Sequence, residues 1–211
     1  YDVSVDVVEI DPAVVRAARE YFALETGPNL SVYTMDGREY LRETDTEYDI
    51  IILDAYRRDT VPFHLTTTEF FALTRDRLAP DGVVLANVIS APSGPGSAFF
   101  RAEYRTMETR FGTVEAFRTA SPGAVQNVEV LAPPGEQSLT TAELRQRAAR
   151  RPIGYELGDA IDRRIESVRT GDVPVLRDDE APVDALLDPM VGQRYVVETA
   201  ATGGPTNESV P

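Results

Sequence analysis

The 211-residue chain contains no cysteine, which excludes disulfide bonds, thiolate catalysis and cysteine-ligated metals. It also has no apolar run of about 18 residues, the length that a membrane-spanning helix needs, so we expect no membrane contact from this chain. His64 is the single histidine, and without a second one we expect no metal site.

Lysine is absent as well: all 21 basic residues are arginine, and 35 acidic residues bring the net charge to −14. Such an acidic surface keeps a protein soluble and repels nucleic acid backbones, so no nucleic acid partner is expected. High acidity without lysine predicts a salt-adapted, halophilic protein of the cytoplasm. The alternative is an acidic protein that is simply poor in lysine. The acidity also suits a cationic substrate, although it is too diffuse to identify one.

The stretch that organises the sequence is residues 48–56, YDIIILDAY. Its four consecutive large aliphatic residues, three of them β-branched, predict a strand that is buried on both faces. The apolar run stops at Asp54. Because ligands of open α/β sheets bind beyond the carboxyl ends of the strands, we predict Asp54 and Tyr56 at the rim of a binding site. The alternative is that Asp54 only opens a polar loop.

Residues 3–131 alternate between strand-like and helix-like segments. Strands are expected at residues 3–9, 30–34, 49–53, 83–89, 113–117 and 125–131. Helices are expected from Asp11-Pro12 onward and at residues 38–42, 69–78 and 99–111, with a turn at residues 79–82. This order predicts an α/β, Rossmann-like fold with a mainly parallel sheet and helices on both faces, the last two strands being candidates for antiparallel pairing.

The character of the sequence changes after Pro133. Residues 140–150 and 155–169 predict arginine-rich helices whose acids balance the arginines, which indicates a solvated face rather than a nucleic acid site. We therefore expect a catalytic domain at residues 1–135 and a helical extension packed on it at residues 136–198. Residues 199–211 are small and polar, and we expect them to be disordered.

Two further acids close predicted strands. Glu9 ends the first strand and could accept hydrogen bonds from ribose hydroxyls; its alternative, capping the next helix, is a role that Asp11 already fills. Asp36 ends the second strand, where it could accept from an adenine amino group while Gly37 lets the chain turn closely around the ring. The alternative is an ordinary Asp-Gly turn. The stronger evidence for a binding site is that three successive predicted strands each end in an acidic residue.

Two other features carry less information. The glycine-rich residues 93–96 do not fit a phosphate-binding fingerprint, because Pro95 removes a backbone N–H. His64 lies on a predicted polar loop, where a structural or substrate-facing role is expected.

Together these motifs resemble the spermidine synthase family of aminopropyltransferases, whose fold is that of class I S-adenosylmethionine-dependent methyltransferases. The resemblance rests on residues 7–12 (VVEIDP), 36–41 (DGREYL), 48–54 (YDIIILD), 62–65 (PFHL) and 78–83 (LAPDGV). Residues 178–182 (DDEAP) also resemble the C-terminal segment of spermidine synthase-like proteins.

The resemblance implies a role for each acid. Glu9, with Ile10 beside it, would hold the ribose of decarboxylated S-adenosylmethionine, and Asp36 with Gly37 would hold the adenine. Asp54 would accept a proton from the attacking amine. Tyr56, Arg57 and His64 would line the side of the amine substrate. No metal is implied, and a homodimer is one assembly that the sequence permits.

Two departures from the family pattern keep alternatives open. Arg57 occupies the position of a second, amine-binding acid, which also suits a methyltransferase of the same fold that uses S-adenosylmethionine. The family's central first strand and its Gly-rich loop are expected to precede Tyr1. Without them, a non-catalytic homologue is the third hypothesis.

Overall fold

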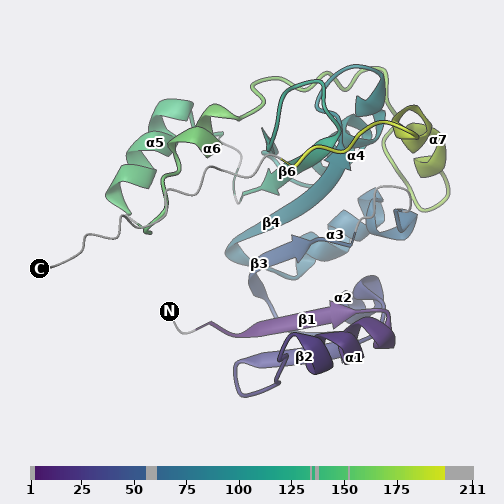
Figure 1. Cartoon of the computed structure of the whole chain (residues 1–211), viewed down its shortest axis with the longest axis vertical. Coiled ribbons are helices and arrows are strands. Elements are labelled where there is room, and N and C mark those ends of the chain that lie inside the picture. The colour runs from purple at the N-terminus through teal and green to yellow at the C-terminus, as the bar shows by residue number, and fades with distance from the viewer. Residues whose placement is uncertain (1–2, 56–60, 134, 136–137, 152, 198–211) are drawn as a thin grey trace, which may run out of the picture.

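The computed structural model describes residues 3–55, 61–133, 135, 138–151 and 153–197 (Figure 1). Its strands are β1 (Val5–Glu9), β2 (Leu30–Thr34), β3 (Tyr48–Leu53), β4 (Leu78–Ser90), β5 (Glu115–Arg118) and β6 (Gln126–Ala132). Its α-helices are α1 (Pro12–Tyr21), α2 (Gly37–Glu43), α3 (Thr68–Asp76), α4 (Ala98–Glu108), α5 (Thr141–Arg150), α6 (Gly158–Asp162) and α7 (Val183–Leu187). Short 3-10 helices cover Phe63–Leu65, Pro95–Ser97 and Asp188–Met190. Within these described ranges, no helix has the length and apolarity that crossing a bilayer requires.

The strands form two sheets. β1 and β2 pair in parallel, from Val5 opposite Leu30 to Glu9 opposite Thr34. The other sheet has the order β3-β4-β6-β5, in which β3 and β4 are parallel and β6 is antiparallel to both of its neighbours. The α/β class is therefore confirmed, and so is the antiparallel pairing of the last two strands.

Local sequence signals set the helix starts. The Asp11 side chain accepts a hydrogen bond from the Ala13 N–H, and Pro12 follows at the first helical position of α1. Thr67 caps α3 by accepting from the Phe70 N–H. The helix start predicted at Asp11-Pro12 was correct because capping chemistry is local. α3 begins at Thr68, one residue before its predicted range.

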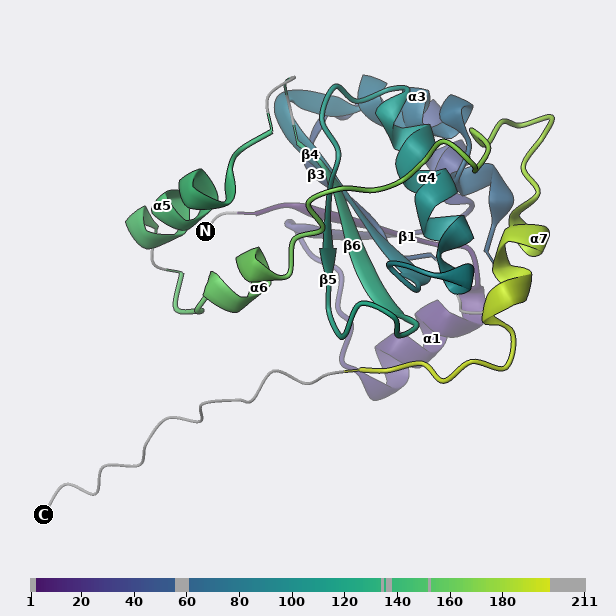
Figure 2. The same ribbon diagram turned by 90° about the horizontal axis from the view of Figure 1, so that it is seen from above.

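The core lies where α3 and α4 cover one face of the four-stranded sheet (Figure 2). The side chains that fill it are almost completely buried: Phe70 and Phe71 from α3, Phe99 and Phe100 from α4, and Val84, Ala86 and Val88 from β4. Each buried aromatic or aliphatic side chain of this size contributes about 1.5–3 kcal/mol. This layer therefore contributes strongly to the stability of the fold.

The organising strand β3 differs from its prediction. Ile51 and Leu53 point into the core, but Ile50 and Ile52 are 57% and 62% exposed. The prediction of burial on both faces was therefore wrong for the described part of the chain. An aliphatic run alone does not show which of its faces is covered by another element.

Two other local predictions need correction. The predicted turn at residues 79–82 is the irregular start of β4, where the pairing register with β3 shifts between Tyr48 and Ile50. A Cβ at Gly82 would lie 2.7 Å from the Tyr48 carbonyl oxygen, so glycine allows this close approach.

The helix predicted at residues 155–169 is shorter in the structure, where only α6 is helical. Beyond it, the Ile165 N–H donates to the Ala116 carbonyl, because the free edge of β5 offers backbone partners that a continued helix would forgo.

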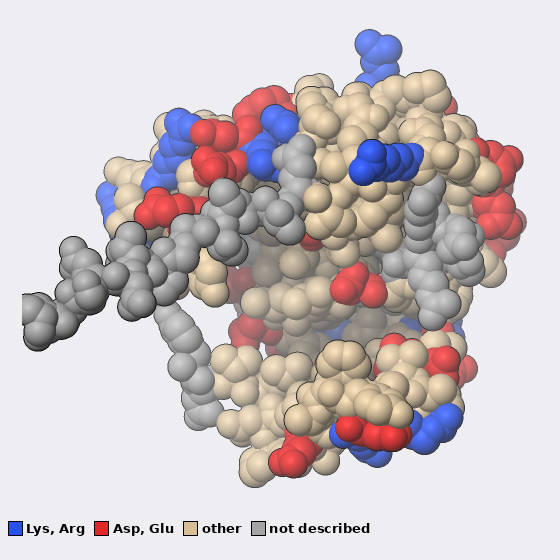
Figure 3. All heavy atoms as spheres, in the orientation of Figure 1, with Lys and Arg blue, Asp and Glu red and all other residues tan. Residues whose placement is uncertain are grey.

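The backbones of β1 and β3 do not pair with each other in the described part of the chain. Val5 and Val7 on β1 are 44% and 36% exposed, and Figure 3 shows a deep recess between the block that holds β1 and the block that holds β3. The expectation of a further central strand stays a prediction. Such a strand would pair with the open edges of β1 and β3.

Side chains join the two sheets instead. The Asp6 carboxylate on β1 accepts hydrogen bonds from the hydroxyls of Tyr40 on α2 and Tyr48 on β3, each at 2.8 Å. Burial is the main cause that raises the pKa of both phenols, so both stay protonated and able to donate. This triad fixes the amino end of β3 against β1.

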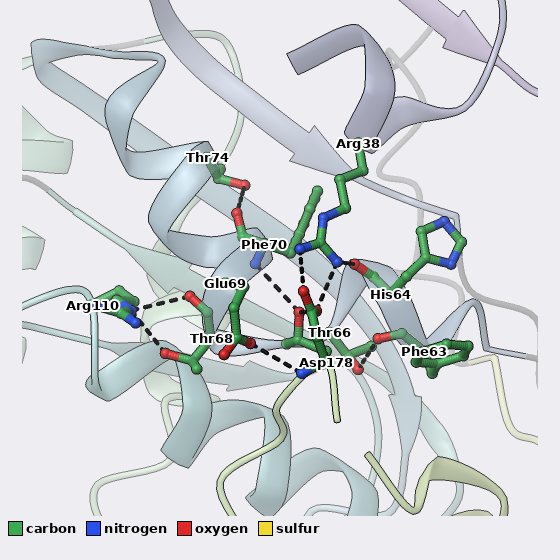
Figure 4. Close-up of polar contacts among 11 residues, drawn as sticks. Arg38, Phe63, His64, Thr66, Thr68, Glu69, Phe70, Thr74, Arg110 and Asp178 are labelled. Carbon is green, nitrogen blue, oxygen red and sulfur yellow. Dashed lines mark hydrogen bonds and ion pairs between the residues drawn. The ribbon is translucent and has the colours of Figure 1, made fainter. Parts of the chain in front are cut away.

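A second joint involves Arg38 of α2 and the segment before α7 (Figure 4). The Arg38 guanidinium donates to both carboxylate oxygens of Asp178, at 2.7 and 2.6 Å, and to the His64 carbonyl at 3.1 Å. The Thr67 hydroxyl donates to Asp178 Oδ1 at 2.6 Å. Only 10% of the Arg38 side chain is exposed, so this bidentate pair is well shielded from water on the arginine side. The C-terminal segment is thereby held against α2 and α3.

We predict that Asp178→Ala lowers the free energy of unfolding, because it leaves the buried Arg38 guanidinium without its carboxylate. The expected loss is about 1.5–3 kcal/mol, nearer the lower value since Asp178 is itself partly exposed. Urea denaturation of wild type and variant measures this loss in the free energy of unfolding. Asp179→Ala is the control, since it removes the same charge from the exposed neighbouring residue. Equal stability of the two variants would contradict the structural role of Asp178.

The same contact has a defined pH dependence. The hydrogen bond from Arg38 lowers the pKa of Asp178 to about 2, below its value in the unfolded chain. The stabilisation is therefore complete above the unfolded pKa, about 4, and is lost as pH falls toward 2. Unfolding measured between pH 5 and pH 2 should show wild type and Asp178→Ala converging toward the acid end.

Candidate active site

The predicted acids lie at the carboxyl ends of strands. The arrows of β1 and β3 point in the same general direction, so these ends of the two sheets share one side of the molecule (Figure 1). Glu9 is the last residue of β1, and its carbonyl accepts from the Met35 N–H at 3.1 Å, which brings Asp36 beside it. Asp54 follows β3 directly. The structure thus brings Glu9 and Asp36 together and places Asp54 in the neighbouring sheet.

Glu9 is more engaged than the sequence predicted. Its Oε1 accepts a hydrogen bond from the Asp11 N–H at 2.8 Å, so the expectation that Asp11 leaves Glu9 free was only half correct. No hydrogen bond within the described ranges uses the other oxygen. Ile10, the next residue, is 66% exposed. One carboxylate oxygen and an apolar side chain are therefore available to a ligand at this strand end.

Asp36 is the N-cap of α2. Its Oδ1 accepts from the N–H groups of Arg38 at 2.8 Å and Glu39 at 3.1 Å, and its Oδ2 lies 2.7 Å from Nε2 of His64. Burial would raise the pKa of Asp36, but the hydrogen bonds from His64 and the backbone together lower it. Asp36 therefore stays ionised, and it is rigidly oriented. A Cβ at Gly37 would meet no atom within 4 Å, so the space beside the cap is open.

His64 was expected on a loop in a structural or substrate-facing role. It lies in the 3-10 helix Phe63–Leu65, with its ring edge-on to Phe63 and its Nε2 bound to Asp36. Its carbonyl accepts from Arg38. In the described structure His64 therefore links the β3–α3 connection to the end of β2.

Asp54 is exposed, and its Oδ1 accepts a hydrogen bond from Nδ2 of Asn87 on β4 at 2.8 Å. Among the described residues this is the one hydrogen bond to Asp54, and it orients the carboxylate. Tyr56 and Arg57, which the sequence predicted beside the substrate, lie outside the described residues.

Asn87 and Glu129 are polar residues that the sequence interpretation passed over. Leu53 is opposite Ala86 and Asn87 is opposite Glu129, so Asp54, Asn87 and Glu129 form a row across β3, β4 and β6. Burial, and then the charge of Asp54, raise the pKa of Glu129. A signal for Asn87 existed, because an amide interrupts the otherwise apolar residues 83–89. Glu129 gave none, since acids alternate with apolar residues on many half-exposed strands.

We also searched the described ranges for a metal site and for a pocket away from the strand ends. These ranges contain no group of three side chains that could hold a metal ion. A surface hollow of about 460 Å³ lies among Arg118, Pro122, Asp159 and Arg163, and none of the predicted site residues lines it. Its open shape and mixed charges make it a weaker candidate site than the row at Asp54.

Solved structures share this fold. Spermidine synthase from Thermotoga maritima superposes with a TM-score of 0.54 at 22% identity, over 75% of this chain and 55% of that one. Human methyltransferase-like protein 13, solved in complex with SAH, superposes with a TM-score of 0.55 at 22% identity, over 72% of this chain and 74% of that one. The Rossmann-like, class I methyltransferase fold predicted from the sequence is thereby confirmed.

The sequence comparisons identify the family. A probable polyamine aminopropyl transferase from Bifidobacterium longum is 30% identical over 192 residues, which are 85% of this chain and 42% of that protein. The chain thus spans less than half the length of this relative. The Spermine/spermidine synthase domain matches residues 1–106, half of the chain and all of the segment that carries Glu9, Asp36 and Asp54. The chain therefore belongs to the spermine/spermidine synthase family.

Proposed function

We propose that this protein transfers an aminopropyl group from decarboxylated S-adenosylmethionine to a small amine. The observation that carries the proposal is the placement of Asp54: an exposed carboxylate at the carboxyl end of β3, oriented by Asn87, inside the segment that matches the family domain. Membership of the family supports the reaction class. Ligands of open α/β sheets bind beyond the carboxyl ends of strands, and this general rule supports a site at Asp54.

The chemistry needs an acid at this position. An alkylammonium has a pKa of about 10, so at neutral pH the acceptor amine must lose a proton before its nitrogen lone pair can attack. Asp54 attracts the cation and takes that proton. The new N–C bond forms as the bond between the propyl carbon and the sulfonium sulfur breaks, and methylthioadenosine leaves. The positive sulfur makes the donor reactive, so the chain itself has to supply only binding, orientation and the proton acceptor.

The adenosine part of the donor is assigned to the ends of β1 and β2. The available oxygen of Glu9 would accept from the ribose hydroxyls, with Ile10 against the ring system. Asp36 has its two oxygens engaged, but a carboxylate offers about four acceptor positions, so it can still accept from the adenine amino group. The open space at Gly37 would admit the base.

A methyltransferase is the second candidate. The superposition on a methyltransferase solved with SAH supports it, and so does Arg57, which would repel a polyamine but suit an anionic or neutral acceptor. The two reactions differ in the donor. Parallel assays with decarboxylated and with intact S-adenosylmethionine therefore distinguish them.

We predict that Glu9→Gln weakens binding of methylthioadenosine to the full-length protein by about tenfold or more, because an amide replaces a charge-assisted acceptor. Isothermal titration calorimetry measures the affinity. Glu20→Gln on the exposed face of α1 is the matched control. Asp36→Asn tests the adenine contact, since Asn preserves the N-cap of α2. If Glu9→Gln and Asp36→Asn both bind as wild type does, the assignment of the nucleoside to these strand ends is wrong.

We predict that Asp54→Asn keeps nucleoside affinity and loses turnover by about 10²–10⁴-fold, the usual contribution of a positioned base. The assay is aminopropyl transfer to putrescine, agmatine and spermidine at low and high salt. Asp49→Asn, at the opposite end of β3, is the control with the same change of charge. If wild type transfers no aminopropyl group but methylates an acceptor from S-adenosylmethionine, the methyltransferase takes the place of the first proposal.

A further inference from the structure

The carboxylate of Asp36 has a single acceptor position left for an adenine amino group. Its Oδ1 already accepts from the N–H groups of Arg38 and Glu39, which occupies both lone pairs of that oxygen. Its Oδ2 accepts from Nε2 of His64, because an ionised carboxylate can only accept. One lone pair of Oδ2 therefore remains, and its direction depends on where His64 holds this oxygen.

His64 is itself held through its backbone. Its carbonyl accepts from the Arg38 guanidinium at 3.1 Å, and its ring lies edge-on to Phe63 (Figure 4). The same guanidinium donates to both carboxylate oxygens of Asp178. A planar guanidinium that is fixed by two parallel hydrogen bonds is a rigid donor, so the position of His64 depends on Asp178.

The turn at residues 177–180 presents Asp178 to Arg38. Two backbone hydrogen bonds between the first and last residues of this turn close it. The Asp178 N–H donates to the Glu69 carboxylate on α3 at 3.1 Å, and its Oδ1 accepts from the Thr67 hydroxyl at 2.6 Å. A folded C-terminal turn is therefore one end of a chain of contacts whose other end is the N-cap of α2.

We propose that Asp178 is a positioning residue for the adenine contact: through Arg38 and His64, it directs the remaining lone pair of Asp36 at the 6-amino group of the base. The inference rests on the proposed function and deepens it, because it makes the C-terminal turn part of donor recognition. An acceptor in this direction favours adenine, which offers an amino donor, over hypoxanthine, which has a carbonyl acceptor at the same position.

The preference between these two bases separates positioning from a purely structural role. If the contacts of Asp178 were only structural, their loss would lower stability and would weaken the binding of both nucleosides equally. A positioning role changes the ratio of the two affinities. That ratio, measured on one variant, does not depend on the fraction of the protein that is folded.

The experiment is calorimetric titration of the full-length protein with methylthioadenosine and with methylthioinosine, its hypoxanthine counterpart. We expect wild type to prefer the adenine nucleoside by about 10- to 100-fold, the effect typical of one charge-assisted hydrogen bond. In Asp178→Ala this preference should fall about 3- to 10-fold.

Asp172→Ala is the matched control. Asp172 lies in the same C-terminal segment and pairs with Arg101, whose side chain is only 16% exposed, so its loss also leaves a shielded guanidinium without its carboxylate. Among the described residues, this pair contacts neither Arg38 nor His64. Asp172→Ala should therefore keep the wild-type preference for adenine.

Two further variants test the route from Asp178 to Asp36. Arg38→Lys keeps the positive charge but loses the planar fork, so the preference should fall as it does in Asp178→Ala. His64→Ala removes the intermediate contact. In that background, Asp178→Ala should not lower the preference any further, because residues that act through one another are not additive.

The results that would overturn the inference are distinguishable from a failure of the proposed function. The positioning role is wrong, and the proposed function stands, if wild type prefers adenine but Asp178→Ala retains the full preference, or if Arg38→Lys does so where Asp178→Ala fails to fold. It is also wrong if Asp172→Ala lowers the preference equally, or if Asp178→Ala still lowers it without His64. If wild type does not distinguish the two nucleosides, the adenine assignment at Asp36 fails and the positioning role fails with it.

Discussion

The ion pair between Arg38 and Asp178 is the contact on which the arrangement of the rest depends. It connects residues 140 positions apart in sequence, and the same guanidinium holds the carbonyl of His64. His64 in turn is bound to Asp36, the cap of the helix on which Arg38 lies. A closed circuit of charge-assisted contacts therefore fixes the end of β2, the connection after β3 and the C-terminal segment relative to one another.

This circuit matters because the candidate site is divided between two sheets. Glu9 and Asp36 lie on the β1–β2 sheet, whereas Asp54, Asn87 and Glu129 lie on the other. In the described ranges the sheets meet through side chains, with the Asp6 triad at one end and the Arg38 circuit at the other. Within the described ranges, the spacing between the strand ends that carry Glu9 and Asp36 and the strand end before Asp54 is thus set by a few directional hydrogen bonds.

Much of the fold followed from local chemistry, and what failed was nonlocal. The Asp11-Pro12 start of α1 and the span of β2 were predicted because capping and β-branched runs act within a few residues. The exposure of Ile50 and Ile52 depends on which elements cover that face of β3, and the sequence of the strand does not show this. For the local structure at Asp36, the sequence suggested only a turn, whereas Asp36 is the N-cap of α2. Its bond to His64, like the row that joins Asn87 to Glu129, depends on strand register, which becomes visible only in three dimensions.

In the described part of the chain, the edges of β1 and β3 that face each other are unpaired, and this has a consequence for the handling of the molecule. Rows of free N–H and C=O groups beside exposed Val5, Val7, Ile50 and Ile52 are templates for intermolecular strand addition, the first step toward ordered aggregates. Net charge of −14 opposes that step by mutual repulsion between copies. Concentrated salt screens this repulsion and at the same time strengthens apolar association. Colloidal behaviour in brine therefore reports directly on whether these edges are covered.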